Sequence, residues 1–95
     1  IYSIEEIKRI ITPIAGQYGV ESVSLFGSYS TGTAKVGSDI DLKIEKGKLR
    51  SLFQIASFRL ALEDALSLPV DLLTSESSDK EFLRESEVLL YRTAR

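Results

Sequence analysis

The chain has 95 residues and a formal charge of −2, and it contains neither cysteine nor histidine. This length fits one domain, residues 1–95, and the two missing residue types exclude disulfides, thiolate nucleophiles, histidine triads and zinc sites built on either residue. Twelve basic against fourteen acidic residues leave no basic block for a nucleic-acid backbone, and no apolar run approaches the ~20 residues that cross a bilayer, so we expect a cytoplasmic protein.

The N-terminal part of the chain predicts a helix followed by a strand. The capping box Ser3–Glu6 begins a helix whose apolar residues recur at helical spacing. Pro13 is expected to kink this helix, and Gly16 and Gly19 mark its end. Residues 21–26 then predict a short strand.

Four further elements follow in the order strand, helix, strand, helix. They cover residues 38–45, 49–66, 70–74 and a last helix from the capping box at Ser78 through about Tyr91. This order favours an α/β (α+β) fold in which a small mixed sheet of three to four strands carries its helices mainly on one face.

Two aspartates lie in the second predicted strand, although strands are poor in this residue. Because side chains alternate along a strand, Asp39 and Asp41 leave the same face, with Cα atoms ~6.5–7 Å apart. Two ionised carboxylates repel each other, and Mg²⁺ relieves that repulsion and commonly bridges to substrate phosphates. The pattern therefore indicates a metal site for phosphoryl or nucleotidyl transfer. The alternative is an amphipathic strand with a solvated polar face.

Asp71 adds a third carboxylate. It lies in the apolar segment 69–73, where burying an unpaired carboxylate would be costly. If this strand neighbours the strand of Asp39 and Asp41, the carboxylates meet across ~4.8 Å. Asp71 could then complete a metal site or accept the proton of an attacking hydroxyl. The alternative is an aspartate at a strand edge that faces water.

A glycine-rich segment follows the first predicted strand. In Gly27–Gly32, backbone N–H groups at a strand-to-helix junction could bind phosphate, and the Ser28 hydroxyl adds a donor. The segment is not a P-loop, because Thr33 and Ala34 occupy the positions of the Lys and Ser/Thr of that motif. An ordinary turn is the alternative.

Three segments in order, Phe26–Tyr29, Ser38–Leu42 and Val70–Leu73, together resemble the nucleotidyltransferase superfamily of DNA polymerase beta. Its signature is a Gly-Ser pair followed at some distance by D-x-D, and here ten residues separate Gly27-Ser28 from Asp39-Ile40-Asp41. The chain is most similar to the minimal nucleotidyltransferase (MNT) group, and the resemblance covers nearly its whole length. It implies the polymerase beta-like fold.

The resemblance also implies a role for each motif residue. Gly27 and Ser28 would hold the triphosphate, and Asp39 and Asp41 would bind Mg²⁺, as two ions. Asp71 would be the third carboxylate, acting as metal ligand and general base. Members of the group transfer AMP from ATP onto a tyrosine of a HEPN-type toxin, so the implied substrate of this chain is ATP or another NTP. The implied partner is such a toxin, with this chain as its antitoxin.

One departure from the group concerns positive charge. Thr31 occupies a position that is commonly basic, so less charge is available to neutralise a triphosphate. Lys35 or Lys43 could supply the missing positive charge. Lys43 shares the face of the aspartates, and we assign it to nucleotide binding. The alternative is that Lys43 forms an ion pair with Asp41. Two other functions stay open: an antitoxin that acts by binding with weak or no catalysis, and a nucleotide-binding domain of a longer enzyme.

Overall fold

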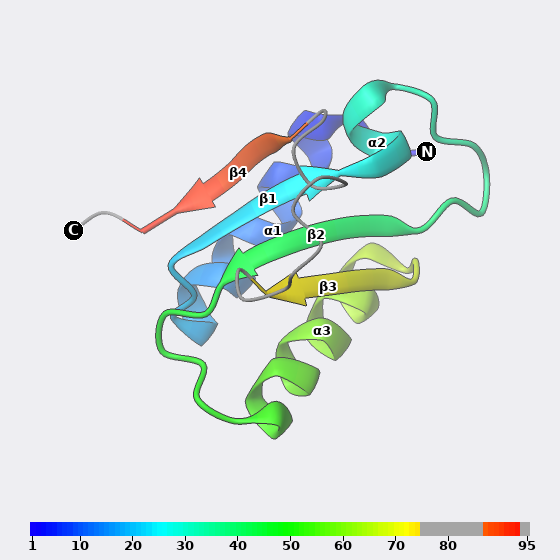
Figure 1. Cartoon of the computed structure of the whole chain (residues 1–95). Helices are drawn as coiled ribbons and strands as arrows, with labels where there is room; N and C mark the ends of the chain where they lie inside the picture. Colours follow the sequence, from blue (N-terminus) through cyan, green and yellow to red (C-terminus); the bar gives the residue numbers. More distant parts are fainter. Residues whose placement is uncertain (75–86, 94–95) are drawn as a thin grey trace.

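The computed structural model describes residues 1–74 and 87–93, which form one mixed sheet with helices packed against it (Figure 1). The elements are α1 (Ile4–Tyr18), β1 (Ser22–Phe26), α2 (Gly27–Thr31), β2 (Ile40–Glu45), α3 (Leu52–Leu66), β3 (Val70–Thr74) and β4 (Val88–Arg92). None of the helices in these described ranges is long and apolar enough to span a membrane.

The sheet has four described strands in the order β3-β2-β1-β4. Strand β1 is antiparallel to both β2 and β4, whereas β2 and β3 are parallel and are joined through α3. The predicted small mixed sheet is therefore confirmed. The parallel pairing matters for function, because it aligns the beginnings of β2 and β3 at one edge of the molecule.

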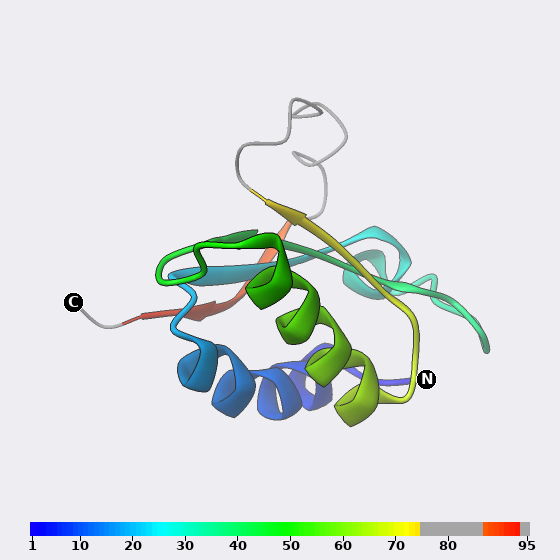
Figure 2. The ribbon, with the colours of Figure 1, turned by 90° about the horizontal axis from the view of Figure 1, so that it is seen from below.

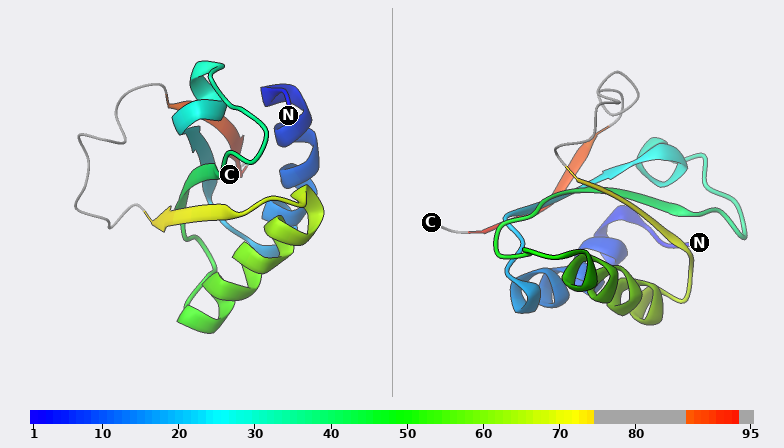
Figure 3. Two further views of the ribbon diagram at one scale, coloured as in Figure 1. Left: turned by 90° about the vertical axis from the view of Figure 1, so that its right-hand side faces the viewer. Right: turned by 60° about the horizontal axis from the view of Figure 1, so that its bottom comes forward.

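Helices α1 and α3 lie side by side on one face of the sheet, as Figures 2 and 3 show. The alternation predicted for β2 is observed: Ile40, Leu42 and Ile44 are buried in the core beneath the helices. The rings of Tyr18 and Phe58 join the two helices, with centroids 5.3 Å apart. Since side chains alternate along a strand, Asp41 and Lys43 project from the sheet face opposite the helices.

The capping box predicted for α1 is present. The Glu6 N–H donates to the Ser3 hydroxyl at 3.1 Å, and the Ser3 N–H donates to the Glu6 carboxylate at 2.8 Å. The helix continues through Pro13 and ends at Gly19, whose φ of 72° is left-handed. A second capping box that the sequence reasoning missed, Ser51 with Gln54, begins α3 at Leu52 rather than at residue 49.

The predicted helix at the C-terminal end is wrong where the structure describes it. Residues 78–86 of that prediction lie outside the described residues, but Val88–Arg92 form strand β4, paired antiparallel with β1. A strand supplies hydrogen-bond partners to the backbone along the free side of β1, and the Thr93 N–H extends the pairing by donating to the Glu21 carbonyl at 2.8 Å. Tertiary pairing therefore outweighs the local helical signal.

Candidate active site

The turn after β1 brings the glycine segment against the second aspartate of the D-x-D motif. Phe26, the last residue of β1, is paired with Asp41 in β2. Gly27 has a φ of 73°, which favours glycine, and a Cβ at this position would overlap the Asp41 carboxylate. The backbone at Gly27 therefore lies directly against this carboxylate. Both the left-handed φ and the lack of space for a Cβ favour glycine at this position.

Helix α2 holds this turn through its own hydroxyls. The Ser30 hydroxyl donates to the Gly27 carbonyl at 2.8 Å. The Thr31 hydroxyl is 3.3 Å from the Gly27 and Ser28 carbonyls and 2.8 Å from the Thr33 hydroxyl. Thr31 thus stabilises the segment locally but brings no positive charge to it.

The parallel pairing of β2 and β3 places Asp41 and Asp71 directly opposite each other. Neighbouring strands are ~4.8 Å apart, so the two carboxylates are neighbours on one face of the sheet. Asp41 is half-buried and Asp71 is exposed. Asp39 is also exposed. It lies immediately before β2, which begins at Ile40, so Asp39 is not itself a residue of the strand.

These like charges act on Asp41. Its pKa is raised above the ordinary value, first by burial, then by the charge of Asp71 and a hydrogen bond with Asp71, and last by the charge of Asp39. A raised pKa means that the folded chain keeps the Asp41 proton to a higher pH than the unfolded chain. The stability from this group is therefore present at low pH and is lost as the pH rises through the raised pKa. At neutral pH the ionised carboxylate opposes folding.

Lys43 lies two positions after Asp41 on the same face of β2, paired with Ser24 on one side and Leu73 on the other. Among the described residues there is no ion pair between Lys43 and Asp41, so the alternative of a simple charge pair is not what this structure shows. The ammonium group therefore remains a candidate for contact with a phosphate.

Comparison with known proteins gives the family. The model of the family described as polymerase beta, nucleotidyltransferase matches residues 8–93. The chain belongs to this family. It is 43% identical over 75 residues to a protein of Methanocaldococcus jannaschii that is provisionally named a protein adenylyltransferase, covering 79% of this chain and 81% of the relative. It is 34% identical over 79 residues to the protein adenylyltransferase MntA of Thermococcus cleftensis, covering 79% and 80%.

Solved structures show the same fold. A chain from a crystal structure of a toxin–antitoxin with AMP-PNP superposes with a TM-score of 0.76 at 24% identity, covering 90% of this chain and 73% of that one. A chain from the complex of a tri-AMPylated HEPN toxin of Shewanella oneidensis with its MNT antitoxin gives 0.69 at 20% identity, covering 95% and 73%. The expected polymerase beta-like fold is thereby confirmed. The resemblance to minimal nucleotidyltransferases is confirmed by the family match and the adenylyltransferase relatives, together with a solved minimal nucleotidyltransferase that is 26% identical.

The carboxylates of this nucleotidyltransferase fit a hard divalent cation in part. In the described ranges, no group of three acidic side chains is gathered closely enough to form a metal site by itself. Mg²⁺, however, is usually held by one or two carboxylates together with substrate phosphates and water. Asp41 and Asp71 supply two carboxylates side by side, and their mutual repulsion is what a cation would relieve.

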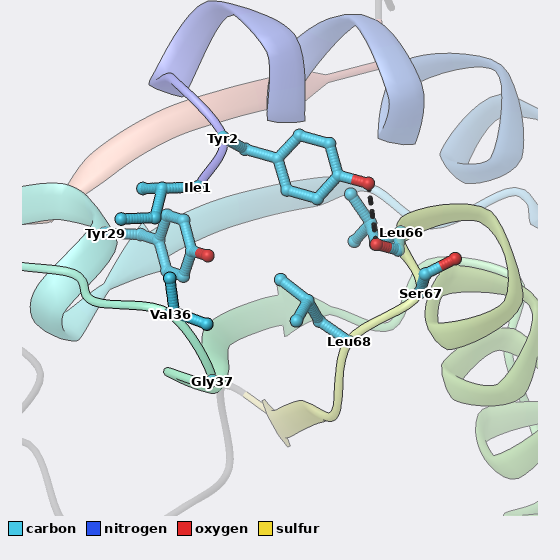
Figure 4. A pocket seen from close by; sticks show the side chains of 8 residues that line it. All are labelled: Ile1, Tyr2, Tyr29, Val36, Gly37, Leu66, Ser67 and Leu68. Atoms are coloured by element: carbon cyan, nitrogen blue, oxygen red, sulfur yellow. Dashed lines mark hydrogen bonds between the residues drawn. The ribbon is translucent and has the colours of Figure 1, made fainter.

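A small pocket lies on the helix side of the glycine segment (Figure 4). Its volume is about 250 Å³, and its lining includes Tyr29 of α2, Tyr2, Val36 and Leu68 but no charged side chain. The Tyr2 hydroxyl donates to the Leu66 carbonyl at 2.7 Å at its rim. The absence of charged side chains from this lining makes the pocket a poor phosphate site.

Sequence reasoning missed Glu63, which fixes the strand that carries Asp71. The Glu63 carboxylate accepts from the Val70 N–H at 3.0 Å and pairs with Arg59 at 3.2 Å. It thereby ties α3 to the first residue of β3. Nothing in the sequence around Glu63 distinguishes it from an ordinary surface acid, because its partner is the backbone of a residue seven positions away.

Proposed function

We propose that this nucleotidyltransferase moves AMP from ATP onto a hydroxyl of a partner protein, its cognate HEPN-type toxin, and so neutralises the toxin in the cytoplasm. The observation that carries the proposal is the position of Asp41, which lies directly against the Gly27 turn on one side and opposite Asp71 of β3 on the other. Support comes from the adenylyltransferase relatives and from the solved complex of an AMPylated toxin with its antitoxin.

The reaction divides among the residues as follows. Gly27 and Ser28 bind the triphosphate through backbone N–H groups and the Ser28 hydroxyl, and Lys43 adds positive charge. The acceptor hydroxyl attacks the α-phosphorus, a new O–P bond forms, and pyrophosphate leaves with the bridging oxygen. Asp71 takes the hydroxyl proton, a role that its exposed position permits.

Asp39, Asp41 and Asp71 are the residues that would hold Mg²⁺, as one or two ions. When bound, the metal neutralises charge on the phosphates and on the departing pyrophosphate. A bound cation would also offset the unfavourable negative charge of Asp41, whose pKa is raised by burial and then by the neighbouring carboxylates. Chelation should therefore stop the transfer.

The test is transfer of label from α-labelled ATP to co-purified toxin in the presence of Mg²⁺. We expect labelling by the parent chain, none with EDTA, and none with Asp39→Asn or Asp41→Asn. Asp71→Asn should slow labelling by about 10²–10⁴-fold, as expected for loss of a general base. Glu5→Gln, an exposed carboxylate on α1, is the matched control and should label normally.

The binding-only alternative gives a different result. Thr31 favours it, because a hydroxyl occupied within its own turn replaces a positive charge near the phosphates. If the parent chain never labels the toxin but still neutralises it, and the aspartate variants neutralise it equally well, the enzymatic proposal is refuted.

A further inference from the structure

Helix α3 has an unusually apolar outer face. Phe53 is 88% exposed, Leu52 is 83% exposed and Leu60 is 57% exposed. The neighbouring helix α1, in the same layer, exposes mainly polar and charged side chains, among them Glu5, Lys8, Arg9, Thr12 and Gln17. The two helices lie side by side (Figure 2), so the apolar surface belongs to α3 and is not a general property of this side of the molecule.

Two of these exposed residues, Phe53 and Leu60, belong to one strip along the helix. Phe58, Leu62 and Leu66 are buried against the sheet and so define the inner side of the helix. At 3.6 residues per turn, Phe53, Leu60 and Asp64 point to the side opposite these three, with Ala56 and Ser57 between them. We call this strip, Phe53, Ala56, Ser57, Leu60 and Asp64, the α3 face.

We propose that the α3 face is the contact between two copies of this chain, which pair with their α3 helices antiparallel about a twofold axis. A twofold contact requires a surface that is complementary to itself. With the axis between Ala56 and Ser57, Phe53 of one copy lies opposite Leu60 of the other. The small residues meet at the crossing point, where they let the helices approach closely.

Charge is complementary in the same arrangement. Arg50 is exposed just before the beginning of α3, and Asp64 is exposed near its end. Antiparallel pairing brings the Arg50 end of each copy to the Asp64 end of the other. The helix dipoles are also opposed, with the positive end of each beside the negative end of its neighbour.

The occupant of this face is a second copy rather than the protein that receives the nucleotide. Helix α3 lies on one face of the sheet (Figures 2 and 3). By strand alternation Asp41 and Lys43 project from the opposite face, whereas the α3 face, which is turned away from the buried Phe58, Leu62 and Leu66, points away from the sheet. An acceptor hydroxyl must reach the carboxylates, so its protein approaches from the other side. In the proposed pair the two catalytic faces point outward in opposite directions and both stay accessible.

The contact is small, and this sets the expected affinity. A helix of 15 residues is about 22 Å long, so a single helix pair lies at the low end of specific interfaces. We expect a dissociation constant on the order of micromolar. The pair should therefore be seen at tens to hundreds of micromolar protein and dissociate on dilution.

Sedimentation velocity or light scattering over a concentration series tests the proposal without reference to activity. The parent chain should change from monomer to dimer as its concentration rises. Phe53→Asp should weaken dimerisation at least tenfold, and its high exposure means that the fold should survive, which circular dichroism checks. Val36→Asp is the matched control, since Val36 is 91% exposed but lies in the loop before β2, and it should dimerise like the parent.

Charge reversal fixes the antiparallel arrangement. Arg50→Glu alone and Asp64→Arg alone should each weaken the dimer, and the double variant should recover most of the parent affinity. A parent chain that stays monomeric at several hundred micromolar overturns the proposal, as does a dimer that Phe53→Asp leaves intact. Loss of toxin binding in Phe53→Asp with a monomeric parent would also overturn it and would assign the α3 face to the partner protein.

Discussion

Replacing Gly27 with alanine tests the central contact of the site. The added methyl group meets two obstacles: a left-handed backbone, with φ of 73°, and the Asp41 carboxylate, which occupies the space that Cβ needs. Gly32 offers a matched control in the same segment. Its φ is 78°, but a Cβ built there meets no described residue within 4 Å apart from its own chain neighbours.

The two positions separate the two costs. A left-handed alanine costs about 1–2 kcal/mol, and this is the whole effect expected for Gly32→Ala. Gly27→Ala carries the same cost plus about 1–3 kcal/mol for displacing a half-buried carboxylate from its place between β1 and β3. In a domain of this size 1 kcal/mol lowers Tm by about 4–8 °C, so Gly27→Ala should melt at least ~4 °C below Gly32→Ala.

Thermal and urea unfolding, followed by circular dichroism, measure this difference, and Asp41→Ala supplies the decisive control. Removing the carboxylate removes the obstacle, so Gly27→Ala should cost less in the Asp41→Ala background than in the parent, by about 1–3 kcal/mol. Equal costs for Gly27→Ala and Gly32→Ala, or strict additivity with Asp41→Ala, would refute the contact between the turn and Asp41.

Three further changes have defined outcomes. Without metal, Asp41→Asn should raise Tm at pH 7 by about 1–8 °C, because like charges opposite each other cost ~0.2–1 kcal/mol. This gain should disappear at low pH, where Asp41 is protonated in the parent chain. Glu63→Ala should lower the free energy of unfolding by about 1–3 kcal/mol because the Val70 N–H loses its acceptor. Arg59→Ala removes only an ion pair and should cost ~0.5 kcal/mol. Equal urea midpoints for the two variants would contradict this difference. Lys43→Ala should raise the KM for ATP more than it lowers kcat. If steady-state kinetics give the variant the same KM for ATP as the parent chain, Lys43 does not bind the nucleotide.

Local signals in the sequence were enough for most of the fold. The capping box at Ser3, the alternation around Ile40 and the apolar segment at Val70 each concern residues within a few positions of one another, and each predicted element is present. The end of the chain differs because its structure depends on a distant partner. Val88–Arg92 become a strand through pairing with β1, more than sixty positions earlier in the chain, and a capping box cannot report that pairing.

The site shows the same division between local and distant information. The D-x-D pattern alone indicated a carboxylate pair of Asp39 and Asp41, yet the pair that the strand register places side by side is Asp41 with Asp71. Thirty positions and the whole of α3 separate these two aspartates, so only the parallel crossover brings them together. Burial, and after it the charge of Asp71, raises the pKa of Asp41, so its ionised carboxylate is disfavoured in the folded chain. A sheet corner built only for stability would not place two carboxylates opposite each other against a glycine that leaves room for them. Their arrangement is understandable if a cation and a triphosphate complete it, and the metal-free gain in stability expected for Asp41→Asn is the direct measure of that unfavourable charge.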